Sequence, residues 1–485
     1  MTSTRVRFAA GIGCVTLLTA CAPDSAGVGS RGIESLAITG VTVIDVATGT
    51  ALPDRTVLVA DDRIVEVGPT TEVSVPPGDT LVPGEGKYLI PGLWDMHEHT
   101  TTDDITREAL FPLFIAHGVT GVRSMAADCF EDETPSCEEE PLATILQVEA
   151  WETEIAKGSL VGPRVVAGSY YVNGPSPDEP STPYNPGTPE DARAHARILA
   201  DRGVDFIKIY SGLDRDAFFA LAEEARRIGL PFEGHVPEAV RASEASEAGM
   251  RSIEHLGDGN VLVECSTQEG QLRERFLAEI DSEAPYFAPI ILQLVETYDP
   301  GRCANVAATL VRHGTWVVPT LMVMRLPEEL EPHWRDDPLF DALPETEVDL
   351  WTEYEGWYTA ELGDPETLAP HARWARELLR SMVELGVPVM AGSDAGDPGV
   401  YWGRGLHEEL ELMVDAGLSA ATVLRSATLA PAEFLGATDS LGTVQPGKIA
   451  DLVLVDGDPL VDIANTQRIQ AVIVRGRLLE RADLD

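Results

Sequence analysis

Basic residues are scarce in this sequence: 35 lysines and arginines stand against 80 aspartates and glutamates, so the 485 residues carry a formal net charge of −45. Such an excess of negative charge repels polyanions, which excludes nucleic acid as a partner. Salt screens the repulsion between surface carboxylates, so we expect the protein to suit saline surroundings.

Long apolar runs are absent after the N-terminal region. Residues 8–18 follow Arg5 and Arg7 and lead into Leu18-Thr-Ala-Cys21, an order typical of an export signal whose last four residues resemble a bacterial lipobox. We therefore predict a lipoprotein-type signal peptide over residues 1–21 and a flexible tether over 22–33. A lipid on Cys21 would anchor the exported protein to a membrane of the cell envelope, on its periplasmic or outer surface; an ordinary cleaved signal is the alternative. No other stretch approaches the roughly 20 apolar residues of a membrane helix.

Cysteine is also rare, with six in the chain, and no CxxC pair occurs, which disfavours a thiolate metal site. Two of the six lie in the predicted signal, and an exported chain allows the other four to form disulfides. Free thiols are the alternative. The pairing in which each bond closes one loop between predicted strands is Cys129–Cys137 with Cys265–Cys303.

The pattern of apolar residues divides the rest of the chain into three parts. Residues 36–88 and 441–476 alternate apolar and polar positions between turn signals, so we predict one small β-sandwich built from both chain ends, 34–88 and 436–485. Between them, strand and helix patterns alternate, which favours an α/β fold with a (β/α)8 TIM barrel over residues 89–435. The eight candidate barrel strands lie near residues 89–96, 118–125, 163–169, 205–210, 231–235, 252–255, 316–323 and 387–393.

Two connections, residues 256–302 and 325–370, are too long for simple barrel loops. The second is rich in aromatic residues, among them Trp334 and Trp351. It could be a lid over the substrate pocket or a satellite helical pair with its own core, and the sequence leaves both open.

Six potential metal ligands each end a short apolar run, which places them at the rim of a parallel barrel, where the catalytic residues of this fold gather. The two histidines of a His-x-His motif at a strand end point to the same side and can reach one cation. Two further histidines, about twenty residues apart with a helix between them, would sit on adjacent strands. The six residues are His97, His99, Lys208, His235, His255 and Asp394.

Lys208 is unusual because it lies between Ile207 and Ile209 on a strand predicted to be buried, where an ammonium group pays a large desolvation cost. A neutral amine there could take up carbon dioxide as a carbamate, and the resulting anion could bridge two metals. A lysine paired inside the barrel is the alternative. Asp394, in a Gly-Ser-Asp-Ala-Gly turn, can bind a metal and act as a base, or can simply cap a helix.

Together these motifs resemble the amidohydrolase superfamily, in particular its imidazolonepropionase-like and prolidase-like branch. The resemblance extends over nearly the whole chain after the tether and includes Leu89-Ile-Pro-Gly-Leu-Trp-Asp-Met-His-Glu-His99. It implies that two divalent metals, most simply Zn²⁺, are bound, with carboxylated Lys208 bridging them. His97, His99 and Asp394 would hold the first metal, and His235 with His255 the second.

The implied function is hydrolysis of C–N amide bonds in small molecules, with dipeptides or acylated amino acids as the expected substrates. A hydroxide bridging the metals would attack the carbonyl, and Asp394 would shuttle the proton. The segment Gly168-Ser-Tyr-Tyr-Val-Asn-Gly-Pro175 departs from the glycine- and histidine-rich segment common in this branch, which puts the substrate in doubt. Tyr210 and Arg123, at two strand ends, are candidate substrate residues, with structural packing as the alternative.

Other chemistries fit part of this pattern. A mononuclear deaminase or cyclic-amide hydrolase would use Glu238, three residues after His235, although Glu238 also suits the first turn of a helix. A binuclear ester or phosphotriester hydrolase would use the same ligands. A non-catalytic metal-binding surface lipoprotein is the remote alternative, and the completeness of the ligand set argues against it. Self-association into a homo-oligomer is compatible with the sequence.

Overall fold

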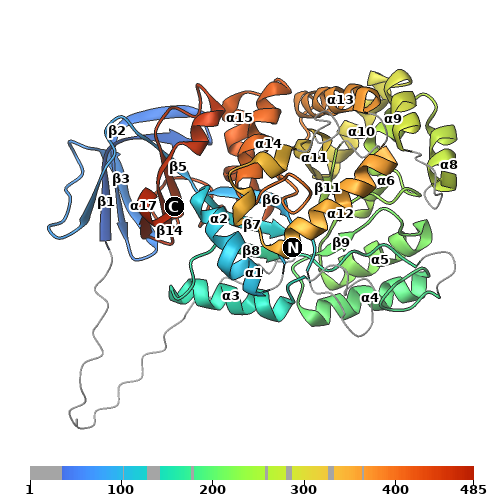
Figure 1. Ribbon diagram of the computed structural model, residues 1–485, viewed down its shortest axis with the longest axis horizontal. Helices are drawn as coiled ribbons and strands as arrows, with labels where there is room; N and C mark the ends of the chain where they lie inside the picture. Colours follow the sequence, from blue (N-terminus) through green and yellow to red (C-terminus); the bar gives the residue numbers. More distant parts are fainter. Residues whose placement is uncertain are drawn as a thin grey trace, which may run out of the picture.

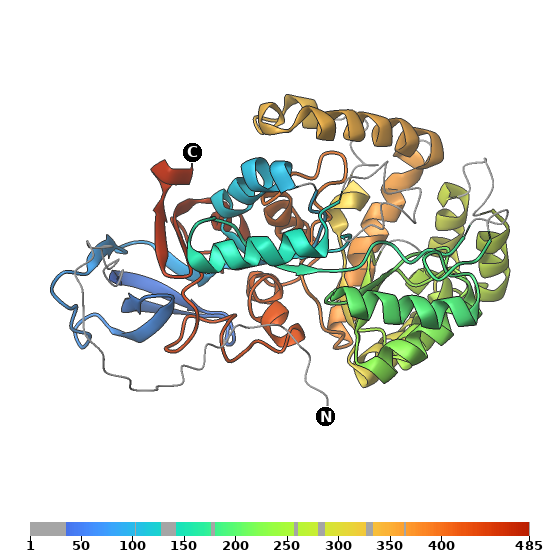
Figure 2. The ribbon, with the colours of Figure 1, turned by 90° about the horizontal axis from the view of Figure 1, so that it is seen from below.

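The computed structural model describes residues 35–101, 103–127, 142–175, 180–256, 260–279, 287–325, 333–362 and 365–484. The predicted signal peptide, the tether and the Cys129–Cys137 pair lie outside these residues. A β-rich part and a larger α/β part lie side by side (Figures 1 and 2). Among the described helices, none has the length and apolar character needed to cross a bilayer.

Both chain ends contribute to one eight-stranded sheet, in which β13 pairs antiparallel with β5 and so joins the C-terminal strands to the N-terminal ones. Its inward side chains form a hydrophobic cluster separate from the main core. The predicted partnership of the two ends is present in this sheet, whereas the sandwich remains a prediction. The strands are β1 (Ser35–Asp45), β2 (Thr50–Ala60), β3 (Arg63–Pro69), β4 (Thr80–Pro83), β5 (Tyr88–Pro91), β13 (Leu452–Val455), β14 (Ile469–Val474) and β15 (Arg477–Glu480).

The α/β part is built on two parallel sheets. Strands β6 (Leu93–Glu98), β7 (Val119–Ser124) and β8 (Arg164–Ala167) form the first, and β9 (Ile207–Ile209), β10 (Phe232–Gly234), β11 (Ser252–Glu254) and β12 (Trp316–Val318) form the second. Isolated parallel bridges connect the two sheets. On one side, Gly168 pairs with Phe206. On the other side, the segment after Val387 lies between the sheets, where Val389 pairs with Val317 and Ala395 pairs with Glu98. The arrangement is TIM-barrel-like, and its eight segments follow the eight predicted strands.

Two of the predicted barrel strands differ from the structure. The strand predicted over 316–323 ends at Val318, because the chain turns into a helix at Leu321. The segment predicted over 387–393 is hydrogen-bonded to both neighbours, for example from Met390 N to Val317 O (3.0 Å) and from Met96 N to Ala391 O (3.0 Å), but makes no continuous ladder. Pro388 contributes no backbone donor to it, which is one physical reason for the interruption.

Helices surround these strands and begin and end where local sequence signals place them. Thr188 caps α4 by accepting a hydrogen bond from Asp191 N, and Gly203 and Gly229 end α4 and α5 with φ of 88° and 78°. The longer helices are α3 (Ile145–Lys157), α4 (Pro189–Arg202), α5 (Arg215–Ile228), α8 (Glu269–Glu279), α9 (Phe287–Glu296), α10 (Pro300–His313), α12 (Glu345–Leu362), α13 (Pro365–Glu384) and α14 (Arg404–Asp415). The shorter ones are α1 (Asp103–Ile105), a π-helical turn (Thr106–Leu110), α2 (Phe111–Ala116), α6 (Ala242–Ala248), α7 (Asn260–Cys265), α11 (Leu321–Arg325), α15 (Ala420–Ser426), α16 (Leu429–Phe434), α17 (Arg481–Leu484) and 3-10 turns at His333–Asp336, Phe340–Ala342 and Ile463–Gln467.

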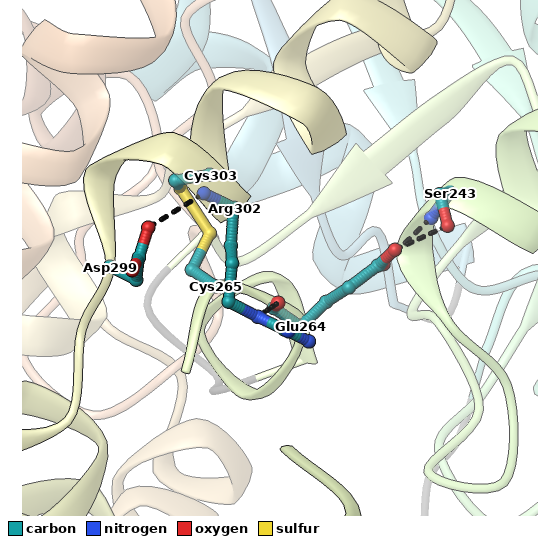
Figure 3. The surroundings of a disulfide bond; sticks show 6 residues. All are labelled: Ser243, Glu264, Cys265, Asp299, Arg302 and Cys303. Atoms are coloured by element: carbon teal, nitrogen blue, oxygen red, sulfur yellow. Dashed lines mark hydrogen bonds between the residues drawn. A yellow bond between two sulfur atoms is a disulfide. The ribbon is translucent and has the colours of Figure 1, made fainter. Parts of the chain in front are cut away.

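The first long connection contains α7, α8, α9 and the start of α10, and a disulfide holds it together. Cys265 at the end of α7 is bonded to Cys303 in α10, and both residues are fully buried (Figure 3). This bond confirms the second of the two predicted pairs. Glu264 beside it accepts a hydrogen bond from Ser243 N (3.0 Å), which ties the connection to α6.

Two aromatic residues of the second long connection, Trp334 and Trp351, belong to the main hydrophobic core. Trp351 of α12 packs edge-on against Trp334 (ring centroids 5.3 Å apart) and Tyr401 (5.1 Å) and stacks on Trp402 (6.0 Å). The Trp351 indole also donates to Gly396 O (2.7 Å), and that of Trp402 to His99 O (3.0 Å). These indole rings therefore hold the backbone beside two of the predicted metal ligands, His99 and Asp394.

Candidate metal centre

Three of the predicted ligands converge closely although they come from distant parts of the chain. His97 lies on β6, His255 directly follows β11, and Asp394 directly follows the eighth barrel segment, residues 387–393. Their ligand atoms all lie within 4.8 Å of one another. His97 Nε2 is 3.2 Å from Asp394 Oδ1, and His255 Nδ1 is 3.3 Å from Asp394 Oδ2. One carboxylate thus lies between two imidazoles.

His99 joins this group from the end of β6. Its Nε2 makes a 3.0 Å hydrogen bond with Asp394 Oδ1, and its ring centroid is 5.6 Å from that of His97. The side chain of His99 is 20% exposed, whereas that of His97 is fully buried. The three residues predicted for the first metal therefore lie together, with His99 on the solvent side.

The residues predicted for the second metal lie next to the first group. The ring of His255 is 4.5 Å from the ring of His235 and 4.5 Å from that of His97. A hydroxyl group contacts each ring: Ser211 Oγ is 2.9 Å from His235 Nδ1, and Thr320 Oγ1 is 2.9 Å from His255 Nδ1, the nitrogen that also faces Asp394. The two predicted ligand sets thus share one continuous cluster.

Lys208 is buried on β9, as the sequence predicts. A Cβ atom at Gly234 on the neighbouring strand would come within 3.0 Å of Lys208 Cδ, so the glycine leaves room for the lysine. Burial is the main cause that lowers the pKa values of His99, His235 and His255, and the charge of Lys208 acts in the same direction on all three. This position is compatible with a bridging role.

The electrostatics of the cluster favour neutral imidazoles and an ionised carboxylate. Burial lowers the pKa of His255 to about 3 and that of His235 well below its usual value. Burial acts in the opposite sense on Asp394, but the adjacent His97 and His255 hold the pKa of that carboxyl well below its ordinary range. Lone pairs are therefore available on both kinds of side chain at neutral pH.

Two further observations fit a bound divalent metal. His97 Nε2 is buried and has no hydrogen-bond partner among the described residues, while its Nδ1 lies 3.0 Å from Glu254 Oε2. His255, Thr320 and Asp394 adopt positive φ of 50°, 45° and 63°, a conformation that non-glycine residues rarely adopt and that collects at functional sites. The donor set of imidazole and carboxylate is one that zinc and similar metals prefer.

Asp95, which sequence reasoning missed, connects β6 to the segment that carries Asp394. Its Oδ1 accepts hydrogen bonds from Ser393 N (3.0 Å) and His97 N (3.2 Å), and its Oδ2 accepts one from Ser393 Oγ (2.5 Å). The contact spans 298 positions of the chain. Asp95 therefore fixes the two ligand-bearing segments against each other.

Aromatic rings line the partly exposed side of the cluster. Tyr210, a predicted substrate residue, lies with its ring centroid 4.3 Å from that of His235. Tyr171, which was not predicted, lies 4.9 Å from Tyr210, and its hydroxyl is 3.3 Å from His99 Nδ1. The only sequence signal for Tyr171 was the departure of residues 168–175 from the pattern of the branch.

The contacts of Arg123 favour structural packing, the alternative to its predicted role as a substrate residue. Its side chain is fully buried and donates to Met96 O (2.6 Å) and to the carboxylates of Glu233 (2.6 Å) and Glu254 (2.8 Å). Although burial acts to raise it, Arg123 and His97 hold the pKa of Glu254 at about 2. Arg123 thus belongs to an ion-pair network inside the barrel, and we no longer assign it to the substrate.

Glu238 lies in the loop after β10. Burial raises its pKa to about 7, while Arg273 and a hydrogen bond with Asn260 act to lower it. Asn260 in turn donates to Val236 O (2.7 Å) and lines a small pocket together with His235 and His255. A carboxyl group that titrates near neutrality thus neighbours the second histidine pair.

A model of the amidohydrolase family matches residues 88–479. The chain belongs to the amidohydrolase family. Over 447 residues, 88% of this chain and 93% of the relative, it is 26% identical to the imidazolonepropionase of Micrococcus luteus. A stretch of 92 residues, 19% of this chain, is 34% identical to the adenine deaminase of Paracoccus denitrificans but spans 15% of that protein.

Solved amidohydrolase structures share the fold. A Xaa-Pro dipeptidase with methionine bound in its active site superposes with a TM-score of 0.63 over 92% of this chain and 100% of the other. At 20% identity this likeness concerns the fold alone. The family model confirms the predicted amidohydrolase family, and the imidazolonepropionase relative of similar length is compatible with the predicted branch.

Proposed function

We propose that this protein is a metal-dependent hydrolase that cleaves C–N amide bonds of small molecules, with dipeptides or acylated amino acids as substrates. The observation that carries the proposal is the convergence of His97, His255 and Asp394 within 4.8 Å, with His99, His235 and Lys208 around them. The dipeptidase among the structural neighbours supports the substrate class, since the same fold hosts that activity in another chain.

Two divalent cations, Zn²⁺ in our proposal, would bind where the predicted ligand sets meet. His97, His99 and Asp394 would hold one, and His235 and His255 the other. Bound cations supply polarisation of a carbonyl group and activation of a water molecule. A neutral Lys208 amine would add to carbon dioxide, forming an N–C bond and losing a proton, and the carbamate anion would complete the site between the two ligand sets.

Asp394 is the group that moves the proton. It is ionised and lies between three imidazoles, so one of its oxygens can accept a proton from the attacking water and deliver it to the departing amine. Tyr210 and Tyr171, both partly exposed, would contact the substrate on the open side of the cluster. We also propose that the eight segments together form a (β/α)8 barrel and that the two chain ends form a small β-sandwich beside it.

Metal content and hydrolysis test this function together. Elemental analysis should find two metals per chain in the wild type, falling to one or none in Lys208→Ala, with loss of activity on a panel of dipeptides and acylated amino acids. Lys157→Ala, at the exposed end of α3, is the matched control and should change neither quantity. One metal in both the wild type and Lys208→Ala would overturn the carbamate-bridged site.

A deaminase or cyclic-amide hydrolase is the second candidate, favoured by Glu238 with its pKa of about 7 and by the adenine deaminase and imidazolonepropionase relatives. In that case amino-heterocycles should release ammonia, or cyclic amides should open, and Glu238→Gln should abolish the reaction. Carboxylic esters and phosphotriesters belong in the same assay, because the ligand set also suits their hydrolysis.

We further propose that the protein is exported and anchored through a lipid on Cys21. The buried Cys265–Cys303 disulfide supports export, because such bonds persist in oxidising compartments. Incorporation of labelled palmitate into the wild type and its loss in Cys21→Ala would test the anchor. An unlabelled protein released into the soluble fraction would contradict it and favour an ordinary cleaved signal.

A further inference from the structure

Glu254 is a fully buried carboxylate in contact with a candidate metal ligand. It is the last residue of β11, and its Oε2 lies 3.0 Å from His97 Nδ1 and 2.8 Å from Arg123 Nη2. The hydroxyl of Ser252 donates to its other oxygen. The side chains of Glu254, His97 and Arg123 are all fully buried, so solvent does not compete for these contacts.

Arg123 holds His97 from two directions. Through Nη2 it binds the carboxylate that meets the His97 ring, and through Nε it donates to the backbone carbonyl of Met96 (2.6 Å), the residue before His97. The guanidinium group is planar and rigid, so it fixes the relative positions of the carboxylate and the strand. Both the backbone and the side chain of His97 are thereby restrained.

The hydrogen bond to Glu254 also decides which nitrogen of His97 carries the proton. A carboxylate accepts a hydrogen bond, so His97 Nδ1 must donate, and the lone pair is then on Nε2. That nitrogen faces Asp394 and has no hydrogen-bond partner among the residues that the structure describes. Carboxylates that orient a ligating histidine in this way strengthen metal binding in other proteins.

We propose that Glu254, held by Arg123, is a positioning residue that orients His97 and keeps its Nε2 free to bind the metal. This inference rests on the proposed metal site. It gives Arg123 a role in the chemistry although the residue lies out of reach of the substrate.

Glu233 provides a matched control. It lies on the adjacent strand β10, is as deeply buried as Glu254, and binds the same guanidinium group at 2.6 Å. Among the residues that the structure describes, its carboxylate pairs with Arg123 and Arg251, and no hydrogen bond joins it to His97. Glu233→Gln therefore weakens a comparable buried ion pair and leaves the carboxylate on His97 in place.

The test is a zinc titration of the metal-depleted, folded protein against a chromogenic chelator, combined with thermal unfolding. We expect Glu254→Gln to weaken zinc binding at the site that His97 helps to form by about 10- to 100-fold, as loss of the hydrogen-bond partner of a ligating histidine does elsewhere. Both Glu233→Gln and Glu254→Gln should unfold at a lower temperature than the wild type. Glu233→Gln should nevertheless bind zinc with wild-type affinity. Glu254→Asp, which keeps the charge, should recover part of the affinity.

Three outcomes separate the possibilities. Equal zinc affinities in Glu254→Gln and Glu233→Gln would overturn the positioning role and leave a structural network. A wild type that binds no zinc or other divalent metal would overturn the proposed function itself. If Glu254→Gln does not fold, Arg123→Lys replaces it: weakened zinc binding in this variant supports the inference, and wild-type affinity refutes it.

Discussion

Removal of the Cys265–Cys303 disulfide is expected to lower the free energy of unfolding by an amount that depends on the length of the loop it closes. The bond closes a loop with a sequence separation of 38 residues. The chain-entropy relation for such a loop gives about 13 cal/mol/K, or about 4 kcal/mol at 25 °C, mainly through greater freedom of the unfolded chain. We therefore expect Cys265→Ser with Cys303→Ser to lose roughly this much free energy of unfolding.

The corresponding change in melting temperature is small because the chain is long. Unfolding entropies near 2.1 cal/mol/K per residue give about 1 kcal/mol/K for 485 residues, so about 4 kcal/mol lowers Tm by about 4 °C. Differential scanning calorimetry of the double variant, and of the wild type with and without reductant, measures this shift. The double variant with and without reductant is the control, because it shows what reduction of the remaining cysteines contributes to the shift.

The same variant should open locally near the metal centre. Arg302 in α10 binds Glu269, and Arg273 in α8 donates to the carbonyls of Glu238 and Val240 in the loop after His235. Loosening α7 from α10 should therefore raise hydrogen exchange in residues 236–241 as well as in α7. An unchanged Tm, together with labelling of Cys265 and Cys303 as free thiols in the unreduced, denatured wild type, would refute the reasoning, because the bond would then not exist in solution.

Other expectations concern the metal centre and the charge of the chain. Asp394→Asn should lower kcat by about 100-fold or more in a steady-state assay, because it removes the proton acceptor; a wild-type kcat would exclude that role. Tyr171→Phe removes the hydroxyl next to His99 and should change KM or kcat several-fold, with Tyr170→Phe as a control that leaves that hydroxyl in place. Burial raises the pKa of Glu409 to about 8, so this carboxyl loses its proton at a lower pH in the unfolded chain than in the folded protein. The contribution of Glu409 to the stability of the metal-free protein should consequently fall by up to about 1.4 kcal/mol per pH unit as pH rises from about 4.5 to 8. The stability of Glu409→Gln should therefore fall less steeply than that of the wild type, as urea unfolding at several pH values would show. With a net charge of −45, added salt should raise Tm, and a Tm independent of salt would remove the expectation of saline surroundings.

Much of the metal centre could be predicted because residues at the ends of successive strands lie side by side in a parallel barrel. His97, Lys208, His235 and His255 lie on or directly after parallel strands, whose carboxyl ends meet at one rim. The sequence shows where each apolar run ends, and these end points were enough to predict that the four residues share one site with His99 and Asp394. The pairing of Cys265 with Cys303 could likewise be predicted, because this bond closes one loop between predicted strands.

What could not be predicted depends on side-chain direction and on partners far apart in the chain. The sequence placed Arg123 near a strand end, but on so short a strand one position decides whether the side chain faces the pocket or the interior. Glu254 meets His97 across 157 positions, and Asp95 meets Ser393 across 298. No local pattern records such pairs.

The sequence by itself determined the family, the parallel strands and the residues available to hold metal, because these follow from local periodicity and from the types of side chain at strand ends. Only the tertiary structure decided which carboxylate orients which histidine and which aromatic rings border the site. The physical reason is that hydrogen bonds and burial depend on distances of a few ångströms between segments that chain folding alone brings together.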